Sequence, residues 1–392
     1  MDSGEMVKAA RGKCSLPPST KVSGVSIDSR SLAPDEAFIA LRGLNRDGHA
    51  FVEAALSQGA SCAIVEQDFK APRGEKRLLR VADTLQALND LGTASRARAK
   101  DTVVIAVTGS VGKTGTKEAL KIALMPSGLV HVSLKSHNNH WGVPLSLANM
   151  RQDTNFGVFE AGMNHAGELK ALTQLIRPHI AIITTVAPVH LGFFRSVEAI
   201  ADAKAEILEG LVPGGAAILN RDNPYFERLR RHAWQRKAKV VSFGETQGAD
   251  ARSLSVELGP ESSEVKADIL GETVSYRIGA PGIHFVQNSL AVLAAAKLAD
   301  ADLKAAAKAL ARVARPDGPR RTHRHRRQGR ARRHHRRKLQ RQSRLDARGA
   351  CHFGAHAAGG IQAPGRRARR HARAWRPRSQ AASGAGGRHR RG

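Results

Sequence analysis

The stretch TVVIAVTGSVGKT, residues Thr102–Thr114, decides the fold of this 392-residue chain. Its first half, Thr102–Val107, is a continuous apolar run, which is typical of a strand buried on both faces of a sheet. A turn rich in glycine follows, and we predict a helix from Thr114 onward. A strand that leads through such a turn into a helix is the context that a phosphate-binding loop requires.

The turn TGSVGKT has the residue types that hold nucleotide phosphates. Its glycines let backbone N–H groups close around phosphate oxygens, and the N-terminus of the helix adds partial positive charge. Lys113 would neutralise the β- and γ-phosphates, and the Thr114 hydroxyl would hold Mg²⁺. The general pattern has another glycine where this chain has Val107, so we interpret the loop as a shorter variant rather than a plain Gly-rich turn. The predicted ATP-binding residues of the loop are Gly109, Ser110, Val111, Gly112, Lys113, Thr114 and Gly115.

The same alternation of strand, turn and helix continues on both sides of this loop. In residues 101–319 we predict further buried strands at Gly157–Phe159, Ile180–Val186, Ala216–Leu219 and Val240–Phe243, and helices at Val197–Leu211 and Gln287–Ala299. In residues 1–99 we predict strands at Val22–Ile27, Phe38–Leu41 and Ser61–Val65, and helices at Ala50–Gln58 and Thr84–Ala99. This alternation predicts an α/β fold with a parallel sheet covered on both faces, in two domains, 1–99 and 100–319.

The composition excludes several classes of protein. A hydrophobic share of 41% is enough for real cores, so the chain is not wholly disordered. Three scattered cysteines, Cys14, Cys62 and Cys351, are too few for a disulfide framework or a metal cluster, which fits a reducing compartment. The N-terminus has no apolar segment typical of a signal peptide, and no apolar stretch is long enough to span a bilayer. We therefore expect a cytoplasmic protein that binds no membrane.

Four residues outside the loop are candidates for chemistry, and each has an ordinary structural alternative. Glu160 ends a predicted strand, where open α/β sheets bind ligands, so it would hold a metal that bridges phosphates or be a solvated acid. His190 follows the next strand, where a histidine is more often structural than a ligand. Lys204, in a predicted helix, has by itself the pattern of a surface lysine. Asn288 would contact a base edge or cap the helix that follows it.

Together these signals occur in an order that resembles the Mur ligases, a family of ATP-dependent amide-bond ligases of bacterial peptidoglycan synthesis. The resemblance runs from about residue 20 to about residue 315. GVSIDSRSLAPDEAFIALRG (Gly24–Gly43) is similar to the family's UDP-binding N-terminal domain, and TGSVGKT is similar to its phosphate loop. NNHWGVPL (Asn138–Leu145) and GMNHAGEL (Gly162–Leu169) are similar to features of the branch that adds D-alanyl-D-alanine.

The resemblance implies metal-binding and catalytic roles for several of these residues. Glu160 and His190 are expected to bind Mg²⁺, together with Thr114. Lys204 matches the lysine that the family carbamoylates, and the resulting carboxylate helps to place a second Mg²⁺. The implied catalytic residues are Lys113, Glu160, His190 and Lys204.

The resemblance also implies contacts to the substrates. Asn288 matches the family's residue that contacts adenine. Ser29 and Arg30 fall where the family holds the UDP moiety, and Asn139 lies in one of the motifs of the D-alanyl-D-alanine-adding branch. We place no role on Phe285, because many members of the family have an asparagine at that position.

The implied reaction joins D-alanyl-D-alanine to UDP-N-acetylmuramoyl-tripeptide, with ATP and Mg²⁺ as cofactors. The terminal carboxylate of the tripeptide attacks the ATP γ-phosphate to form an acyl phosphate, from which the amine of D-alanyl-D-alanine displaces phosphate. The protein neutralises charge and positions the reactants. The resemblance thus implies a monomeric cytoplasmic enzyme of peptidoglycan synthesis, which serves cell shape and division. Two alternatives stay open, a sister Mur-type ligase or folylpolyglutamate synthase, and a basic protein that binds nucleic acid.

The last 73 residues differ from the rest of the chain. Residues 320–392 contain 24 of the 63 Lys and Arg residues and one acid, Asp346, so they contribute +23 to the net charge of +29. They have no helix or strand periodicity, although the Mur ligases continue there with a third, Rossmann-like domain. A basic arm that binds nucleic acid or an anionic surface is one explanation of this composition.

The codons that could encode this tail provide another explanation. One permissible set of codons for HRRKLQRQSRLDARGAC (His335–Cys351), read one base later, encodes IDESYNANPASMRAAL, which resembles the opening of the family's third domain. The segment around Arg367–Trp375 similarly permits VAVLGDMLELG in the same frame. We therefore interpret residues 320–392 as an out-of-frame, disordered tail, with the shift between about Arg315 and Arg321. We expect the chain as written to have little or no ligase activity.

Overall fold

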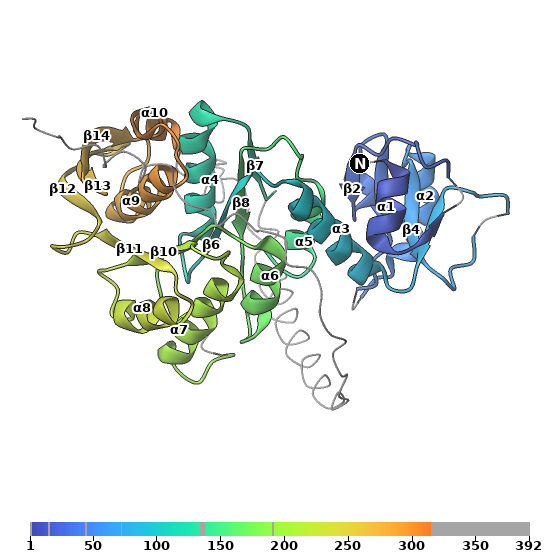
Figure 1. The fold of residues 1–392 in the computed structure, drawn as a ribbon, viewed down its shortest axis with the longest axis horizontal. Coiled ribbons are helices and arrows are strands. Elements are labelled where there is room, and N and C mark those ends of the chain that lie inside the picture. The colour runs from blue at the N-terminus through green and yellow to red at the C-terminus, as the bar shows by residue number, and fades with distance from the viewer. Residues whose placement is uncertain are drawn as a thin grey trace, which may run out of the picture. The chain divides into compact units, whose positions relative to one another are not determined.

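A computed structural model of the chain describes residues 2–14, 16–43, 45–71, 73–133, 138–189 and 192–314. These residues form two β-sheets, one of five strands and one of nine (Figure 1). The interpretation of residues 320–392 as an out-of-frame segment lies outside the described residues, and so does His190. None of the described helices is long and apolar enough to cross a membrane.

The smaller sheet is formed by the N-terminal part of the chain. Its strands are β1 (Lys13–Cys14), β2 (Gly24–Ser26), β3 (Glu36–Ile39), β4 (Cys62–Glu66) and β5 (Leu78–Val81), and its helices are α1 (Ser3–Ala10), α2 (Val52–Ser57) and α3 (Thr84–Arg98), with 3₁₀ turns at Ser29–Ser31 and Gly48–Phe51. The order is β1-β5-β4-β3-β2, with β2 to β5 parallel and β1 antiparallel to β5. Adjacent residues of β3 face opposite sides, so Phe38 packs in a core with Val52, and Ile39 packs in another with Leu88.

The larger sheet has the order β14-β13-β12-β11-β10-β9-β6-β8-β7. Its strands are β6 (Val103–Thr108), β7 (Val130–Val132), β8 (Phe156–Glu160), β9 (Ile180–Ile183), β10 (Ala216–Asn220), β11 (Lys239–Gly244), β12 (Ala251–Leu258), β13 (Ser263–Ile269) and β14 (Glu272–Ile278). From β7 to β12 neighbouring strands are parallel, and the last three strands are antiparallel to one another. The strand that leads into the glycine-rich turn, β6, therefore lies inside the sheet, between β8 and β9.

Helices cover both faces of this sheet, as the residues of β6 show. Ile105 lies in a core with residues of α4, α9 and α10, whereas Ala106 lies in a second core with residues of α5, α6, α7 and α8 (Figure 1). The helices are α4 (Lys113–Leu124), α5 (Gly142–Ala148), α6 (Glu168–Ile176), α7 (Val197–Ala205), α8 (Phe226–Gln235), α9 (Ile283–Leu298) and α10 (Leu303–Ala309), with 3₁₀ turns at Met125–Ser127, Glu206–Gly210 and Leu310–Arg312. The predicted α/β fold with helices on both faces of a parallel sheet is thus confirmed.

Two of the differences between the structure and the predicted elements concern the larger sheet and the helix of Asn288. The sheet is mixed, because the predicted parallel strands continue into the antiparallel strands β12, β13 and β14, which the sequence prediction did not include. Helix α9 begins at Ile283, four residues before the predicted start, so Asn288 lies inside the helix and does not cap it. The domain boundary predicted between residues 99 and 100 falls between α3 and β6 and stays a prediction.

Candidate functional site

The glycine-rich turn lies between the carboxyl end of β6 and the start of α4. Gly109 has φ +152° and Gly112 has φ +86°, backbone conformations that a side chain would strain. Gly112 is also the N-cap residue of α4, and a Cβ atom there would come within 2.8 Å of the Asn288 side-chain nitrogen. The turn therefore needs glycine for its conformation, and at Gly112 also for the close approach of α9. The first N–H groups of α4 open onto this turn, as in a phosphate-binding loop.

The two polar residues that open α4 have different partners. The Lys113 ammonium donates a hydrogen bond to the Gly109 carbonyl oxygen at 2.9 Å, back across the turn. Burial lowers the pKa of Lys113, and the nearby Glu160 carboxylate opposes that shift. The Thr114 hydroxyl donates to Glu160 Oε2 at 2.9 Å, so the predicted metal-binding hydroxyl and carboxylate are in direct contact.

Glu160 is buried at the carboxyl end of β8, next to β6 in the sheet. Only 1% of the residue is exposed, so the alternative of a solvated acid is wrong. Its Oε1 accepts a hydrogen bond from Asn138 Nδ2 at 2.8 Å, and its backbone N–H donates to Ser133 Oγ at 3.3 Å. The carboxylate is therefore held from two sides, by Thr114 on α4 and by Asn138 after β7.

Lys204 lies in the last turn of α7 and is 2% exposed, so the alternative of a surface lysine is also wrong. Burial lowers its pKa to about 7, and the positive charge of Lys113 contributes to this shift. The two lysines thus belong to one electrostatic environment, which stabilises the neutral amine of Lys204 relative to its ammonium form.

The donor atoms at this end of the sheet suit Mg²⁺. A hydroxyl and a carboxylate are hard oxygen ligands, and Mg²⁺ in nucleotide sites is commonly bound by one or two protein oxygens together with phosphates and water. Among the residues that the structure describes, no three His, Cys, Asp or Glu side chains form a metal-binding group. Thr114 and Glu160 therefore fit an ion that a bound nucleotide completes, and the predicted contribution of His190 lies outside the described residues.

The remaining loop residues have distinct environments. The Ser110 N–H donates to the Thr185 carbonyl at 2.8 Å, and its hydroxyl both donates to the Ala187 carbonyl and accepts from the Ala187 N–H. Ser110 therefore fastens the phosphate loop to the segment after β9. The Val111 side chain is exposed, and a Cβ atom on Gly115 would meet open space.

The two adjacent asparagines before α5 differ in their contacts. Asn139, which was predicted to bind substrate, accepts hydrogen bonds through Oδ1 from the backbone N–H groups of Trp141 and Gly142. The side-chain oxygen of Asn139 therefore caps backbone N–H groups at the start of α5. Asn138, which the sequence prediction did not include among the site residues, contacts Glu160 instead. Sequence spacing alone could not distinguish the two, because which side chain faces β8 depends on how the chain enters α5.

The residues predicted to hold UDP line a cavity of about 580 Å³ beside the smaller sheet. Ser29 and Arg30 lie on its wall in a 3₁₀ turn, where the Arg30 guanidinium donates to both carboxylate oxygens of Asp28. The wall also contains polar and aromatic residues that the sequence prediction did not include, namely Asn45, Arg46, Phe51 and Trp141.

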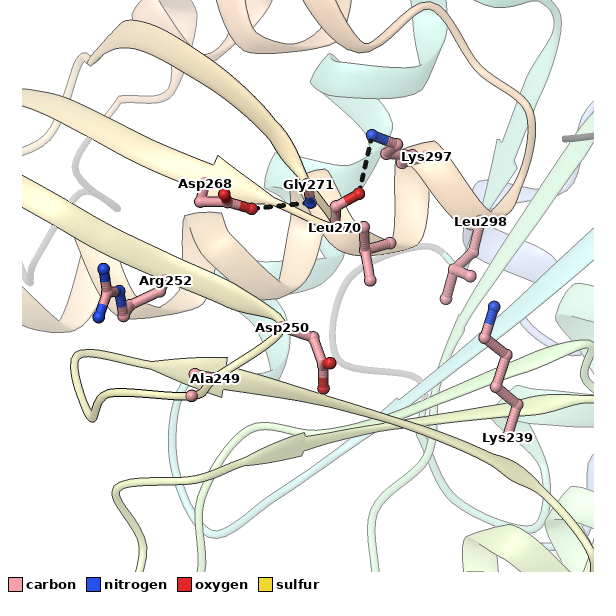
Figure 2. A pocket seen from close by; sticks show the side chains of 10 residues that line it. Lys239, Ala249, Asp250, Arg252, Asp268, Leu270, Gly271, Lys297 and Leu298 are labelled. Carbon is pink, nitrogen blue, oxygen red and sulfur yellow. Dashed lines mark hydrogen bonds between the residues drawn. The ribbon is translucent and has the colours of Figure 1, made fainter.

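Another cavity, of about 780 Å³, is lined by Lys297 and Leu298 at the C-terminal end of α9 and by residues of the neighbouring strands (Figure 2). Asp268 accepts a hydrogen bond from the Gly271 N–H at 2.8 Å, and the Lys297 ammonium donates to the carbonyls of Ile269 and Leu270. These charged groups close the turn between β13 and β14, so they are structural partners rather than ligands for a substrate.

Two family models match this chain. The Mur ligase middle domain matches residues 107–296, and the Mur ligase family, catalytic domain, matches residues 21–96. The first match contains the phosphate loop, Glu160, Lys204 and Asn288, and the second contains Ser29.

Relatives with known names are similar over both of these regions. UDP-N-acetylmuramoyl-tripeptide–D-alanyl-D-alanine ligase of Rickettsia prowazekii is 34% identical over 295 residues, which are 75% of this chain and 65% of that protein. The ligase of the same name from Bacillus subtilis is 34% identical over 70% of this chain and 58% of its own length. This chain therefore spans less than two thirds of the length of these relatives.

A solved structure agrees with these sequence matches. MurF from Acinetobacter baumannii is 32% identical and has a TM-score of 0.72, over 80% of this chain and 68% of the MurF chain. On the evidence of its sequence, its fold and its phosphate loop, this chain belongs to the Mur ligase family.

Proposed function

We propose that this protein is an ATP-dependent ligase that adds D-alanyl-D-alanine to UDP-N-acetylmuramoyl-tripeptide, as the names of its relatives describe. The observation that carries the proposal is the group of Lys113, Thr114 and Glu160 at the carboxyl ends of the parallel strands, with the buried Lys204 within electrostatic range of Lys113. Open α/β sheets bind ligands at this edge. Relatives more than 30% identical carry the D-alanyl-D-alanine-adding name, which favours this substrate over those of sister ligases.

The nucleotide would be held by the phosphate loop. Backbone N–H groups at the start of α4 would donate to phosphate oxygens, and the Lys113 ammonium would exchange the Gly109 carbonyl for a phosphate oxygen. Asn288 lies beside Gly112 on α9, so its side chain is placed at the edge of the loop, where it could contact the rest of the nucleotide. In this arrangement Ser110 keeps the loop in shape, because its polar groups already have protein partners.

Mg²⁺ would be held by the Thr114 hydroxyl and the Glu160 carboxylate, and His190 is a proposed further ligand. A bound Mg²⁺ would offset negative charge on the phosphates. The protein's own contribution is to hold the carboxylate in a fixed orientation, since Asn138 and Thr114 each bind one of its oxygens. This fixed orientation removes the need to order a flexible side chain when the nucleotide binds.

The N-terminal cavity would bind the UDP part of the other substrate. Its wall has guanidinium groups, from Arg30 and Arg46, that suit a pyrophosphate. It also has the rings of Phe51 and Trp141, which suit a flat base. The remote UDP moiety would thus anchor a substrate whose reacting carboxylate lies at the other end of the molecule.

In the proposed reaction the tripeptide carboxylate attacks the γ-phosphorus of ATP, and ADP leaves. The amine of D-alanyl-D-alanine then attacks the acyl phosphate, phosphate leaves, and an amide bond forms. Both steps bring negative groups together, so the positive charge of Lys113 at the phosphates reduces their repulsion.

Binding of both substrates tests this proposal. Calorimetric titration of UDP-N-acetylmuramoyl-tripeptide and of ATP with Mg²⁺ into the full chain is expected to show one site for each. Arg46→Ala is expected to weaken binding of UDP-N-acetylmuramoyl-tripeptide by about tenfold, because one charge-assisted contact to phosphate is lost, and to leave ATP binding unchanged. Absence of binding by both ligands would overturn the proposal, and a preference for a folate substrate would favour the folylpolyglutamate synthase alternative.

Lys204 is proposed to act as a carbamate. Its pKa of about 7 leaves much of the amine neutral near neutral pH, and the neutral nitrogen can bond to the carbon of CO₂ with release of one proton. The product has charge −1, which replaces repulsion from Lys113 by attraction. Lower pH protonates the amine and so opposes this step.

Lys204→Ala, in a chain that has ligase activity, is expected to lose at least about a hundredfold in rate, because the carboxylate that helps to place a second Mg²⁺ is missing. Short carboxylic acids such as acetate are expected to restore part of the rate. The rate of phosphate release with and without acetate measures both effects. A Lys204→Ala protein with full activity would show that this lysine has a structural role only.

A further inference from the structure

Lys117 is a buried lysine that the proposed mechanism does not use. It lies on α4 one turn after Lys113, and its side chain is 0% exposed. Lysine is rarely buried completely, because taking its ammonium out of water is costly unless hydrogen bonds compensate. An apolar side chain would fill the same space without that cost, so the contacts of the ammonium group need an explanation.

The Lys117 ammonium joins α4 to the end of β7. It donates a hydrogen bond to the Ser133 carbonyl oxygen at 2.9 Å and lies 3.1 Å from Glu118 Oε1. The Glu118 carboxylate is about half exposed. Of the two contacts, the hydrogen bond to Ser133 is therefore the one that links Lys117 to the protein interior. Because Ser133 directly follows β7, this bond fixes where the edge strand ends relative to the phosphate-loop helix.

Ser133 in turn contacts the strand that carries the proposed metal ligand. Its N–H donates to the Val158 carbonyl at 3.2 Å, and its Oγ accepts from the Glu160 N–H at 3.3 Å. All three polar groups of Ser133 are therefore bound by Lys117 or by β8. The backbone of Glu160 is thus tied to α4 through Ser133, while its carboxylate is tied to α4 through Thr114.

We propose that Lys117 is a positioning residue, which holds Glu160 in the orientation that accepts the metal of a metal–nucleotide complex. The inference rests on the proposed function, in which Thr114 and Glu160 bind Mg²⁺. In this role Lys117 acts through Ser133. It fixes Ser133, and Ser133 fixes the end of β8 so that the Glu160 carboxylate stays against the Thr114 hydroxyl.

The test compares nucleotide binding with and without the metal. A non-hydrolysable ATP analogue is titrated calorimetrically into the full chain with excess Mg²⁺ and again with a chelator. Lys117→Met, which keeps the length of the side chain and removes its charge, is expected to reduce the gain in affinity from Mg²⁺ by about tenfold, as losses of groups that orient metal ligands commonly do. Affinity without Mg²⁺ is expected to stay within about twofold of wild type, because the phosphate loop itself is unchanged.

Two further variants keep the test decisive. Lys121→Met removes the same charge from the same helix at a less buried position, and it is expected to leave the gain from Mg²⁺ unchanged. Ser133→Ala removes the acceptor of the Glu160 N–H and keeps Lys117, and it is expected to reduce the gain as Lys117→Met does. If Lys117→Met does not fold, as thermal melting would reveal, Lys117→Leu takes its place and is expected to reduce the gain in the same way, because it also lacks the ammonium that binds the Ser133 carbonyl.

The outcomes separate this inference from the proposed function. A wild-type chain whose nucleotide affinity does not depend on Mg²⁺ would overturn the proposed metal site and the inference with it. A wild-type chain with a clear gain from Mg²⁺ that Lys117→Met and Ser133→Ala both retain would overturn the inference alone. Loss of the gain in both variants, with metal-free affinity preserved, would support it.

Discussion

Replacing Lys113 with alanine is expected to weaken ATP binding by at least about 30-fold, which corresponds to about 2 kcal/mol. In the structure its ammonium donates to the Gly109 carbonyl, inside the turn that the phosphates would occupy. A bound phosphate would offer the ammonium an anionic acceptor in place of the neutral carbonyl oxygen, which adds attraction between opposite charges to the hydrogen bond. Calorimetric titration of ATP into both proteins measures the difference.

A matched variant controls for the loss of charge and of helix stability. Lys121 lies two turns further along α4, and Lys121→Ala removes one positive charge from the same helix. ATP affinity is expected to change by no more than about twofold in this control, because a half-buried charge two turns away from the phosphates is largely screened by salt. An ATP affinity that Lys113→Ala leaves unchanged would show that the turn is not a phosphate-binding loop.

The centre of the larger sheet could be predicted from sequence because its residues have no exposed face. The apolar run predicted at Thr102–Val107 is strand β6 at Val103–Thr108, and the predicted helix from Thr114 is α4. The antiparallel strands at the edge were harder to identify. In β13 the charged Glu264 and Lys266 are exposed and alternate with buried small or apolar residues, so the segment has no continuous apolar run. This alternation is the pattern of a strand with one buried face, and the sequence prediction missed it because it relied on continuous apolar runs.

The candidate site could be predicted in its residue types but not in its contacts. Glu160 and Lys204 each had a plausible exposed alternative, since neither the end of a strand nor a helix sequence of alanines and acids reveals how deeply a side chain lies. Burial depends on residues far away in the sequence, such as Asn138, whose side chain contacts the Glu160 carboxylate. Lys117 had no sequence signal at all, because its partner Ser133 is 16 residues away on another element.

Removal of one base between codons 315 and 321 is expected to raise ligase activity by at least about a hundredfold over the chain as written. This shift would replace residues 320–392 by a sequence that contains IDESYNANPASMRAAL and VAVLGDMLELG, two segments that resemble the family's third domain. The expected contribution of this third domain is to bring the amine and the acyl phosphate together, and such positioning accounts for large increases in rate. Phosphate release that depends on both UDP-N-acetylmuramoyl-tripeptide and D-alanyl-D-alanine measures the gain.

Removal of three bases from the same interval is the matched control, because it shortens the chain by one residue and leaves the frame unchanged. This control is expected to give no gain in activity. ATP binding should persist in the chain as written and in both deletion variants, since the phosphate loop and Glu160 lie upstream of the change. A protein made after removal of one base that binds ATP and the UDP substrate but remains inactive with D-alanyl-D-alanine would contradict the out-of-frame interpretation. DNA binding that weakens with salt, and that is lost only in the protein made after removal of one base, would instead reflect the charge of residues 320–392. Such binding is driven by counterion release and is not sequence-specific.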